Sequence, residues 1–424
     1  MGARRLFADT TPLRTPDFRR LWLAGIVTVV GANLTVFAVP VQLYALTQSS
    51  AYVGLAGLFA LVPLVVFGLL GGAWADAMDR RVLLVVTSIG LAAASVLLWL
   101  QAALGLDNVW VVLVLLAVQQ AFYAVNWPTR GAAIPRMLPT EQLPAANSLT
   151  MTVAQFGAIV GPLLAGMLLR WVDLSTLYLI DAVTTLAAIW ATIRLSPMPS
   201  TESVAVQGQS RWGFGAVWEG FRYLAGNQIV LMSFVVDLIA MILGMPRALF
   251  PQMANESFGG PISGGTTMAM LAAAISGGAV AGGVFSGWLP RIRRQGLAVV
   301  LSIVVWGLAI VGFGVAGGAA GGRGGSMLAL AVLCLAIGGA ADMVSAAFRS
   351  TILQEAASDD LRGRLQGVFI VVVGGGPRLA DAVHGAAAAA VGTTVAAVGG
   401  GVLVVVGVVV AALAAPAFLR YRPG

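Results

Sequence analysis

The sequence contains twelve apolar runs, which short polar segments separate. Each run reaches the length of about 20 residues that a transmembrane helix needs, and in lipid every backbone polar group must be satisfied within such a helix. Only 10% of the residues are charged, which excludes a water-soluble fold. We therefore expect an all-α membrane protein with twelve transmembrane helices in two pseudo-repeats of six. The runs are 20–46, 52–75, 82–104, 109–128, 147–169 and 175–196, then 228–252, 267–289, 296–318, 326–347, 365–390 and 394–418.

Residues 197–227 lie between the two sets of runs and are rich in proline, serine, glycine and charge. This composition predicts a cytoplasmic linker followed by a short amphipathic helix at the membrane surface. It separates an N-terminal bundle, 1–196, from a C-terminal bundle, 228–424. The loops after the second and eighth runs both place glycines before arginines, and Arg130 and Arg349 are expected just past the fourth and tenth runs. These similar patterns in the two halves indicate an internal duplication.

The residue types exclude several chemistries. All 24 basic residues are arginine, so the chain can form neither a Walker-type phosphate loop nor a lysine Schiff base. One histidine, His384, and one cysteine, Cys334, exclude a disulfide framework and a metal cluster rich in these residues. We therefore expect neither an enzyme nor a protein with a metal or a cofactor.

The arginines predict the orientation of the chain. If the N-terminus is cytoplasmic, only Arg170 and Arg323 fall in outside loops, and only Arg247 and Arg378 fall inside predicted spans. The other arginines share the cytoplasmic side, where basic residues are retained. Both termini are therefore expected in the cytoplasm. The net charge of +7 does not indicate nucleic-acid binding, because the arginines lie between apolar runs rather than on one polar face.

The loop after the second run reads Gly72-Ala73-Trp74-Ala75-Asp76-Ala77-Met78-Asp79-Arg80-Arg81. At a helix end, Asp76 can pair with Arg130 or meet the positive end of a neighbouring helix. Such a contact would hold one conformation closed. The alternative is an ordinary loop whose arginines only set the topology. The predicted gating residues are Gly72, Asp76, Arg80, Arg81 and Arg130.

The fifth run contains Gly157, Gly161, Pro162 and Gly166. Small residues four apart let two helices approach closely, and a proline inside a span bends it. We expect this helix to pack closely against a partner helix. Packing alone is the alternative explanation of the pattern.

Both motifs resemble signatures of the major facilitator superfamily. The loop resembles the pattern G-x-x-x-D-R-x-G-R-R, with Ala77 and Asp79 in place of an arginine and a glycine. The fifth run is similar to the antiporter motif G-x-x-x-G-P-x-x-G-G of drug and proton exchangers, with Ala165 in place of one glycine. The resemblance implies a twelve-helix transporter that exports its substrate.

Three further segments look like the branch that holds the bacterial enterobactin exporters and related macrolide and multidrug efflux proteins. They are Phe37-Ala38-Val39-Pro40-Val41-Gln42, residues 128–149, and Arg247-Ala248-Leu249-Phe250-Pro251. This resemblance implies export of an enterobactin-like catecholate siderophore, or a similar amphipathic molecule, across the bacterial inner membrane by alternating access. The alternative is a broad-specificity multidrug or macrolide efflux proton antiporter, and an importer is a further one.

Ionisable residues inside spans cost a few kcal/mol each at the bilayer centre, so each is a functional hypothesis. The candidates for proton coupling, with a proton gradient as the energy source, are Asp237, Asp342, Arg378, Asp381 and His384. Arg378, Asp381 and His384 recur every three residues and share one helical face. A carboxylate beside an arginine and an imidazole can change protonation, which favours a proton relay. The alternative is that Arg378 and Asp381 only neutralise each other while His384 reaches the outer interface.

Glycines and a proline precede this stripe at 374–377, and they predict a hinge or break in the helix.

Arg247 lies inside a predicted span beside Phe250 and Pro251. A fixed cation there suits an anionic aromatic substrate, although it can also extend to the membrane interface. Aromatic and polar residues of other spans are expected to line the substrate cavity, the alternative being interfacial aromatic belts. The substrate-binding candidates are Asn33, Phe37, Gln42, Tyr44, Gln120, Tyr123, Gln155, Phe156 and Arg247. We expect a monomer whose partners are a small-molecule substrate and the lipid bilayer, with no nucleic acid.

Overall fold

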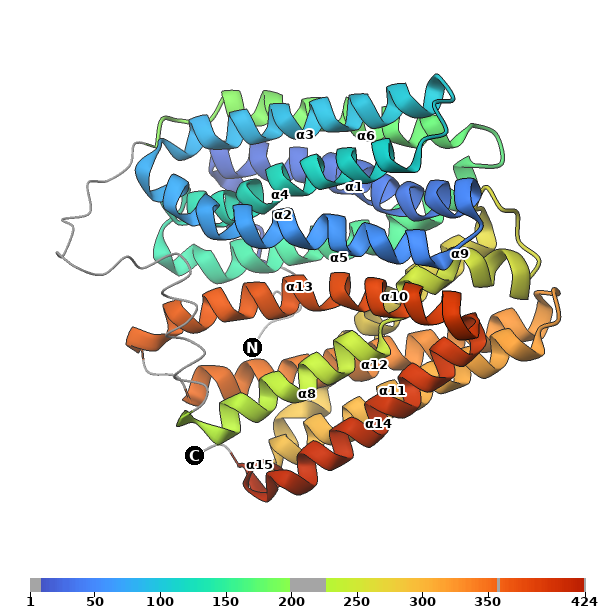
Figure 1. Cartoon of the computed structure of the whole chain (residues 1–424). Coiled ribbons are helices and arrows are strands. Elements are labelled where there is room, and N and C mark those ends of the chain that lie inside the picture. The colour runs from blue at the N-terminus through green and yellow to red at the C-terminus, as the bar shows by residue number, and fades with distance from the viewer. Residues whose placement is uncertain (1–8, 199–225, 357–358, 423–424) are drawn as a thin grey trace. The chain divides into compact units, whose positions relative to one another are not determined.

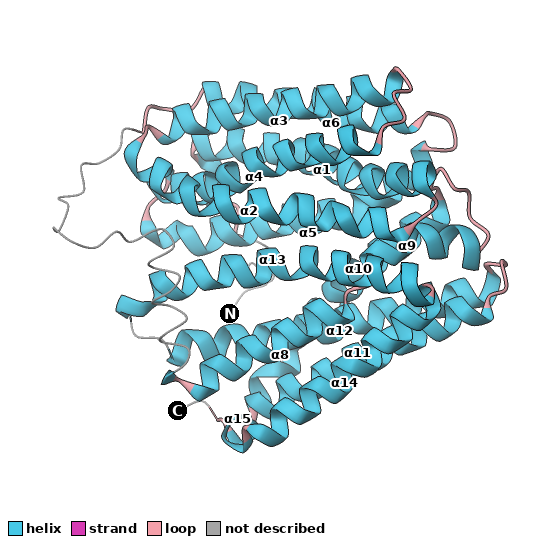
Figure 2. Cartoon of the chain, in the orientation of Figure 1, coloured by secondary structure: helices cyan, strands magenta, loops and turns pink. Residues whose placement is uncertain are grey.

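The computed structural model describes residues 9–198, 226–356 and 359–422. The side chains of 72–73, 75–77 and 354–373 lie outside this description, as does nearly all of the predicted linker 197–227. Within the described residues, the regular structure is entirely helical (Figure 2). Eleven of these helices are long and apolar enough to cross a membrane.

The long helices follow the predicted runs (Figure 1). Those of the N-terminal part are α1 (Pro16–Thr47), α2 (Ser50–Ala77), α3 (Arg80–Ala103), α4 (Val109–Met137), α5 (Leu143–Leu168) and α6 (Leu174–Ile193). Those of the C-terminal part are α8 (Gln228–Gly244), α10 (Thr266–Val284), α11 (Gln295–Ala319), α12 (Gly325–Ala356), α13 (Asp359–Val391) and α14 (Thr393–Ala414). With α13 beside the eleven candidate spans, the prediction of an all-α fold with twelve long helices is confirmed.

Polar residues mark where several of these helices begin. The side chain of Asp79 accepts a hydrogen bond of 2.8 Å from the backbone N–H of Arg81 at the start of α3. Asn108 caps α4 in the same way through the backbone of Trp110, at 2.9 Å. These side chains satisfy N–H groups that have no partner inside the helix.

Two helices extend further than the apolar runs that predicted them. α4 continues to Met137 and α12 to Ala356, so Arg130 and Arg349 lie inside helices. The expectation that they lie just past the helices is wrong. Loss of hydrophobicity ends a membrane run, but arginine is a good helix former, and the helical hydrogen bonds continue through it.

The seventh predicted span, 228–252, is not one continuous helix. α8 ends at Gly244, and after Met245 and Pro246 the chain forms a 3-10 turn (Arg247–Leu249), the short α9 (Phe250–Gln252) and a π-helical turn (Met253–Ser257). Met245 is extended, with φ −108° and ψ 90°. A residue before proline disfavours the helical region, which explains the break.

The expected break in the eleventh span is absent, because α13 is helical through Gly374, Pro377 and beyond. Arg378 donates a hydrogen bond of 2.6 Å from its Nη1 to the Gly374 carbonyl, which adds a bond to this turn. Unpaired backbone groups are costly in an apolar medium, so the helix persists despite its glycines.

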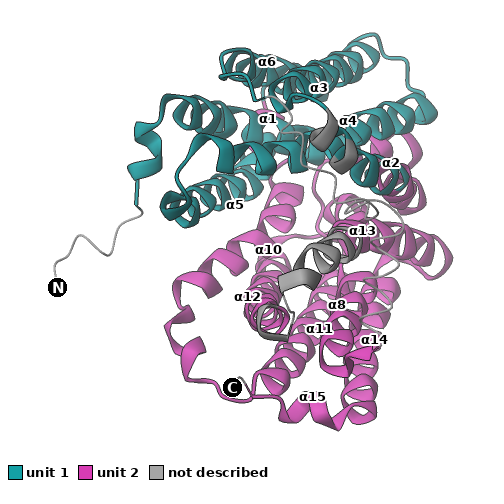
Figure 3. Cartoon of the chain, turned by 90° about the vertical axis from the view of Figure 1, so that its left-hand side faces the viewer, with its two compact units in different colours: residues 1–39, 62–165, 171–213 teal, residues 40–61, 166–170, 214–424 magenta. Residues whose placement is uncertain are grey.

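The chain divides into two compact units (Figure 3). The first unit comprises 1–39, 62–165 and 171–213, and the second comprises 40–61, 166–170 and 214–424. Most of each predicted half falls in one unit. The end of α1, the start of α2 and the end of α5 fall in the second.

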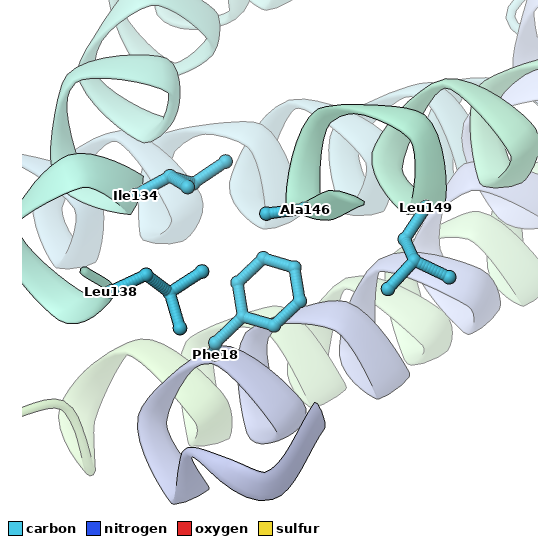
Figure 4. Packing of buried hydrophobic residues seen from close by; sticks show 5 residues of the cluster. All are labelled: Phe18, Ile134, Leu138, Ala146 and Leu149. Atoms are coloured by element: carbon cyan, nitrogen blue, oxygen red, sulfur yellow. The ribbon is translucent and has the colours of Figure 1, made fainter. Parts of the chain in front are cut away.

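Each unit has its own packed interior. In the first, Phe18 of α1 lies among Ile134, Leu138, Ala146 and Leu149 from α4, α5 and the segment between them (Figure 4). α3 also packs against α4 and α6. In the second, α11 packs against α12 and α14, while α10 packs against α12.

Candidate functional site

The second unit contains a charged cluster inside its helices. Arg349 of α12 forms an ion pair with Asp237 of α8 through its Nη1, and its Nη2 lies 3.9 Å from Oδ1 of Asp342. The side chains of Asp237 and Arg349 are 3% and 13% exposed. Asp342 and Arg349 are seven residues apart, which places them on one face of α12, two turns from each other. Two carboxylates therefore share one guanidinium.

This cluster brings together Asp237 and Asp342, two of the predicted proton-coupling residues, and adds the guanidinium of Arg349. Sequence reasoning placed Arg349 in a loop, so it missed the cation that holds Asp237 and Asp342 together. The seven-residue spacing to Asp342 was the available signal. It gains meaning only when α12 is known to extend past residue 347.

The predicted relay residues Arg378, Asp381 and His384 all lie on α13. Oδ1 of Asp381 is buried and has no hydrogen-bond partner among the described residues. Arg378 lies close enough to Asp381 to interact with it electrostatically, which fits both the relay and the alternative of mutual neutralisation. His384 is 2% exposed and hydrogen-bonds the backbone of Leu243, which disagrees with the alternative in which it reaches the outer interface.

Asp381 is closely covered by the start of α2, which belongs to the same unit. A Cβ atom on Gly57 would lie 2.9 Å from Cβ of Asp381 and would overlap the Arg378 carbonyl. A Cβ atom on Gly54 would overlap the Asp381 carbonyl. The two helices approach so closely that only glycine fits at these positions.

A second polar network of this unit joins α1 and α2 to the turns after α8. Tyr44 donates to Oε1 of Glu256 at 2.8 Å, and Gln252 donates to Oε2 of Glu256 at 2.9 Å. Ser50 donates to Gln252 at 2.6 Å. Tyr44, a predicted substrate-binding residue, is thus buried and engaged with Glu256, which sequence reasoning missed. A glutamate in the turns after an apolar run was the only signal for it.

Arg247 begins the 3-10 turn after α8 and is exposed. It lies close enough to Asp342 and Asp381 to interact with both electrostatically. Phe250 is buried, with its ring edge-on to Phe313 at 5.6 Å between centroids, so its ring is not available to a substrate. Arg247 therefore places an accessible positive charge near two of the candidate acids.

In the first unit, the predicted gating arginines bind backbone carbonyls. Arg130 donates to the carbonyl of Leu21 in α1 at 2.7 Å, where Gly25 leaves room for the guanidinium. Arg80 donates to the carbonyl of Ala132 at 3.1 Å, and Arg81 to that of Ile193. The side chains of the predicted Gly72 and Asp76 lie outside the described residues.

The glycines of α5 make the close approach that their spacing predicts, and their partner is α1. A Cβ on Gly157 would overlap Val29, and one on Gly161 would overlap Asn33. Gly166 lies in the second unit, where a Cβ would lie 2.6 Å from the carbonyl oxygen of Gly265. Pro162 lies within the same helix.

The remaining substrate-binding candidates differ in exposure. Tyr123, Gln155 and Phe156 are exposed, and Tyr123 stacks on Trp127 at 6.0 Å between centroids. Phe37 and Gln42 are buried. Asn33 and Gln120 are half-buried, and Asn33 donates to the Val29 carbonyl of its own helix at 2.7 Å. The exposed group can meet a ligand without a change of side-chain packing.

The model of the Major Facilitator Superfamily matches residues 21–380. The chain belongs to this superfamily. It is therefore a multi-pass membrane transporter.

Similar sequences include the proteins named Enterobactin exporter EntS from Shigella boydii serotype 18 and Escherichia coli O81. Each is 28% identical to this chain over 356 residues, which are 84% of this chain and 81% of the relative.

Among solved structures, the nucleoside transporter NupG matches with a TM-score of 0.73 at 15% identity, covering 96% of this chain and 100% of that one. A bacterial homolog of the human lysosomal transporter Spinster matches with a TM-score of 0.71 at 16% identity, covering 98% and 100%. At these identities the structures show the shared fold alone.

Proposed function

We propose that this protein exports an enterobactin-like catecholate siderophore, or a similar amphipathic molecule, across the bacterial inner membrane in exchange for protons. The named exporters that resemble it over 84% of its length support the substrate class. The charged cluster of Asp237, Asp342 and Arg349 supports the proton coupling. The distribution of arginines supports a cytoplasmic position for both termini.

The shared arginine explains how the cluster responds to a proton. With both acids ionised, these three residues together carry one net negative charge, which is costly away from water, and the exposed Arg247 nearby offsets part of it. A proton on either acid leaves a neutral pair of the other acid and Arg349. Asp342 is the more exposed acid, with 36% of its side chain accessible against 3% for Asp237. We therefore assign the exchanged proton to Asp342 and the permanent ion pair to Asp237.

Arg247 connects this cluster to an anionic substrate. Its exposed guanidinium offers charge and a planar face to a deprotonated catechol ring. Because Arg247 also interacts with Asp342, a bound anion and the carboxylate compete for the same cation. Substrate binding at Arg247 thereby alters the charge balance around the proton acceptor.

Export in cells tests the proposal. The gene is expressed in an Escherichia coli strain that lacks its own enterobactin exporter, and enterobactin in the medium is measured by mass spectrometry. We expect export to be restored by the wild type and reduced at least about tenfold by Arg247→Gln, a loss of about 1.4 kcal/mol in binding. Arg323→Gln, at another exposed arginine of the second unit, is the matched control. Equal export by both variants contradicts the role of Arg247.

Multidrug efflux is the second candidate, favoured by the exposed aromatic residues Tyr123 and Phe156. If the protein leaves enterobactin export unchanged but protects a sensitive strain from dyes or macrolides, this second function replaces the first. In inverted vesicles, either substrate is expected to accumulate under a pH gradient, and a protonophore should abolish the accumulation.

A further inference from the structure

A separate buried carboxyl group lies in the first unit, on α6. Asp181 is 2% exposed, and three other helices direct hydrogen-bond donors to its Oδ2. Thr35 of α1 donates at 2.7 Å, Ser95 of α3 at 2.8 Å, and Gln119 of α4 at 3.5 Å. Gln119 also donates to the Ser95 hydroxyl at 3.2 Å. Four helices of the unit therefore meet at one carboxylate oxygen.

The groups around Asp181 are neutral. α1, α3 and α4 present Thr35, Ser95 and Gln119 to it, and its own helix adds Thr184 and Thr185, which donate to the Asp181 carbonyl. No charged side chain of the described residues is among these partners. Asp237 of the second unit, by contrast, has an arginine. An ionised carboxylate held only by neutral donors in an apolar bundle is costly, so its charge state is open to change.

Hydrogen bonding alone does not require an acid at this position. Elsewhere in the same unit a neutral amide joins two helices by hydrogen bonds. Asn126 of α4 donates to Thr87 at 2.8 Å and to Ser88 at 3.4 Å, both in α3. An asparagine at 181 could likewise accept from Thr35 and Ser95. The property that aspartate adds over asparagine is the ability to bind and release a proton.

We propose that Asp181 is a proton-binding residue of the first unit, distinct from the acids of the second unit. Each donor to Oδ2 comes from a different helix, so a movement of α1, α3 or α4 against α6 changes how well the anion is stabilised. The proton affinity of Asp181 therefore depends on how the helices of its unit pack. A role of Asp181 in transport rests on the proton-driven export proposed above. Proton binding by Asp181 does not depend on that proposal.

Infrared difference spectra between acidic and alkaline pH test the proton site in the purified full-length protein, without any substrate. A protonated carboxyl group gives a C=O stretching band that an ionised one lacks. Because other acids also contribute to this band, we expect Asp181→Asn to lose one component of the wild-type band, while Asn126→Ala keeps the whole band. An unchanged spectrum in Asp181→Asn overturns the proposal.

Two further variants keep the test decisive if Asp181→Asn fails to fold. Thr35→Val and Ser95→Ala each remove one donor to the carboxyl group and leave the acid in place. Loss of a hydrogen bond is expected to move the carboxyl band to a higher frequency in both. If both bands stay where the wild type has them, Asp181 is not the group that titrates.

A proton-release assay separates this proposal from the proposed function. Enterobactin is added to the detergent-solubilised protein in weak buffer, and the pH change is recorded with an indicator dye. We expect Asp181→Asn to release fewer protons than the wild type, and equal release overturns the role of Asp181 in transport. If the wild type releases none while the infrared band is present, proton-driven export fails and the proton site remains.

Discussion

Each half of the chain has an arginine near the end of its fourth helix, and the two arginines have different partners. Arg130 of α4 binds a backbone carbonyl of α1 beside Gly25, whereas Arg349 of α12 binds carboxylates of α8 and α12. In both halves the arginine thus contacts the first helix of its own half. The cation occupies a similar position in the two halves, but its partner is a carbonyl in the first and carboxylates in the second. One arginine joins two helices through a carbonyl, and the other belongs to a cluster with two carboxylates.

The largest expected effect follows from Arg349→Gln. It leaves Asp237 buried without its cation, and breaking a buried ion pair in this way costs about 3–5 kcal/mol. Thermal unfolding of the purified protein in detergent should show a large fall in Tm, with loss of transport. The double variant Asp237→Asn with Arg349→Gln should recover part of the stability, because the buried charge is gone. If the double variant is no more stable than Arg349→Gln, the unpaired charge of Asp237 is not the cause of the lost stability.

Arg130→Gln is expected to have a smaller effect than Arg349→Gln. It removes one charged hydrogen bond to a carbonyl, worth about 1.5–3 kcal/mol, without leaving a described carboxylate unpaired. The same thermal measurement gives the comparison directly. If the two single variants lose equal stability, the two arginines contribute equally to the stability of the fold, and the contrast between the halves is wrong.

Two glycines extend the contrast to packing. A Cβ on Gly25 would lie 2.5 Å from the flexible end of Arg130, which can move aside, whereas one on Gly57 would meet the backbone of α13. We expect Gly57→Ala to cost about 1–3 kcal/mol, as overpacking does, and Gly25→Ala to cost less. Tm values of both variants test this order. Gly68→Ala is the control, because nothing lies within 4 Å of its Cβ position.

The helices themselves were predictable, because the length of an apolar run and the cost of unpaired backbone in lipid act locally along the chain. Their ends were less so: α4 and α12 continue past their apolar runs, and α8 breaks at Pro246 within one. The acids Asp237 and Asp342 were predictable as costly residues inside spans. Their shared partner Arg349 was not, because the pairing of α8 with α12 joins residues more than 100 positions apart. The donors to Asp181 were likewise not predictable, because Thr35 and Ser95 lie far from it in the sequence and on other helices.

The smallest expected effect concerns the third helix of each half. α3 begins at the capping side chain of Asp79, which also accepts from the backbone N–H of Met198 at 3.2 Å. The corresponding α11 begins after Arg294, whose side chain makes no capping bond. Replacing a capping residue by alanine costs about 1 kcal/mol, so Asp79→Ala should lower Tm slightly.

The converse change, Arg294→Asp, should raise Tm, because it supplies an acceptor and a negative charge at the positive end of α11. Asp79 stands where the superfamily pattern has glycine, and glycine at a cap costs only a few tenths of a kcal/mol relative to a good capping residue. Asp79→Gly should therefore lie between the wild type and Asp79→Ala. If Asp79→Gly is the less stable of the two, the difference between glycine and alanine as caps does not determine the stability at this position.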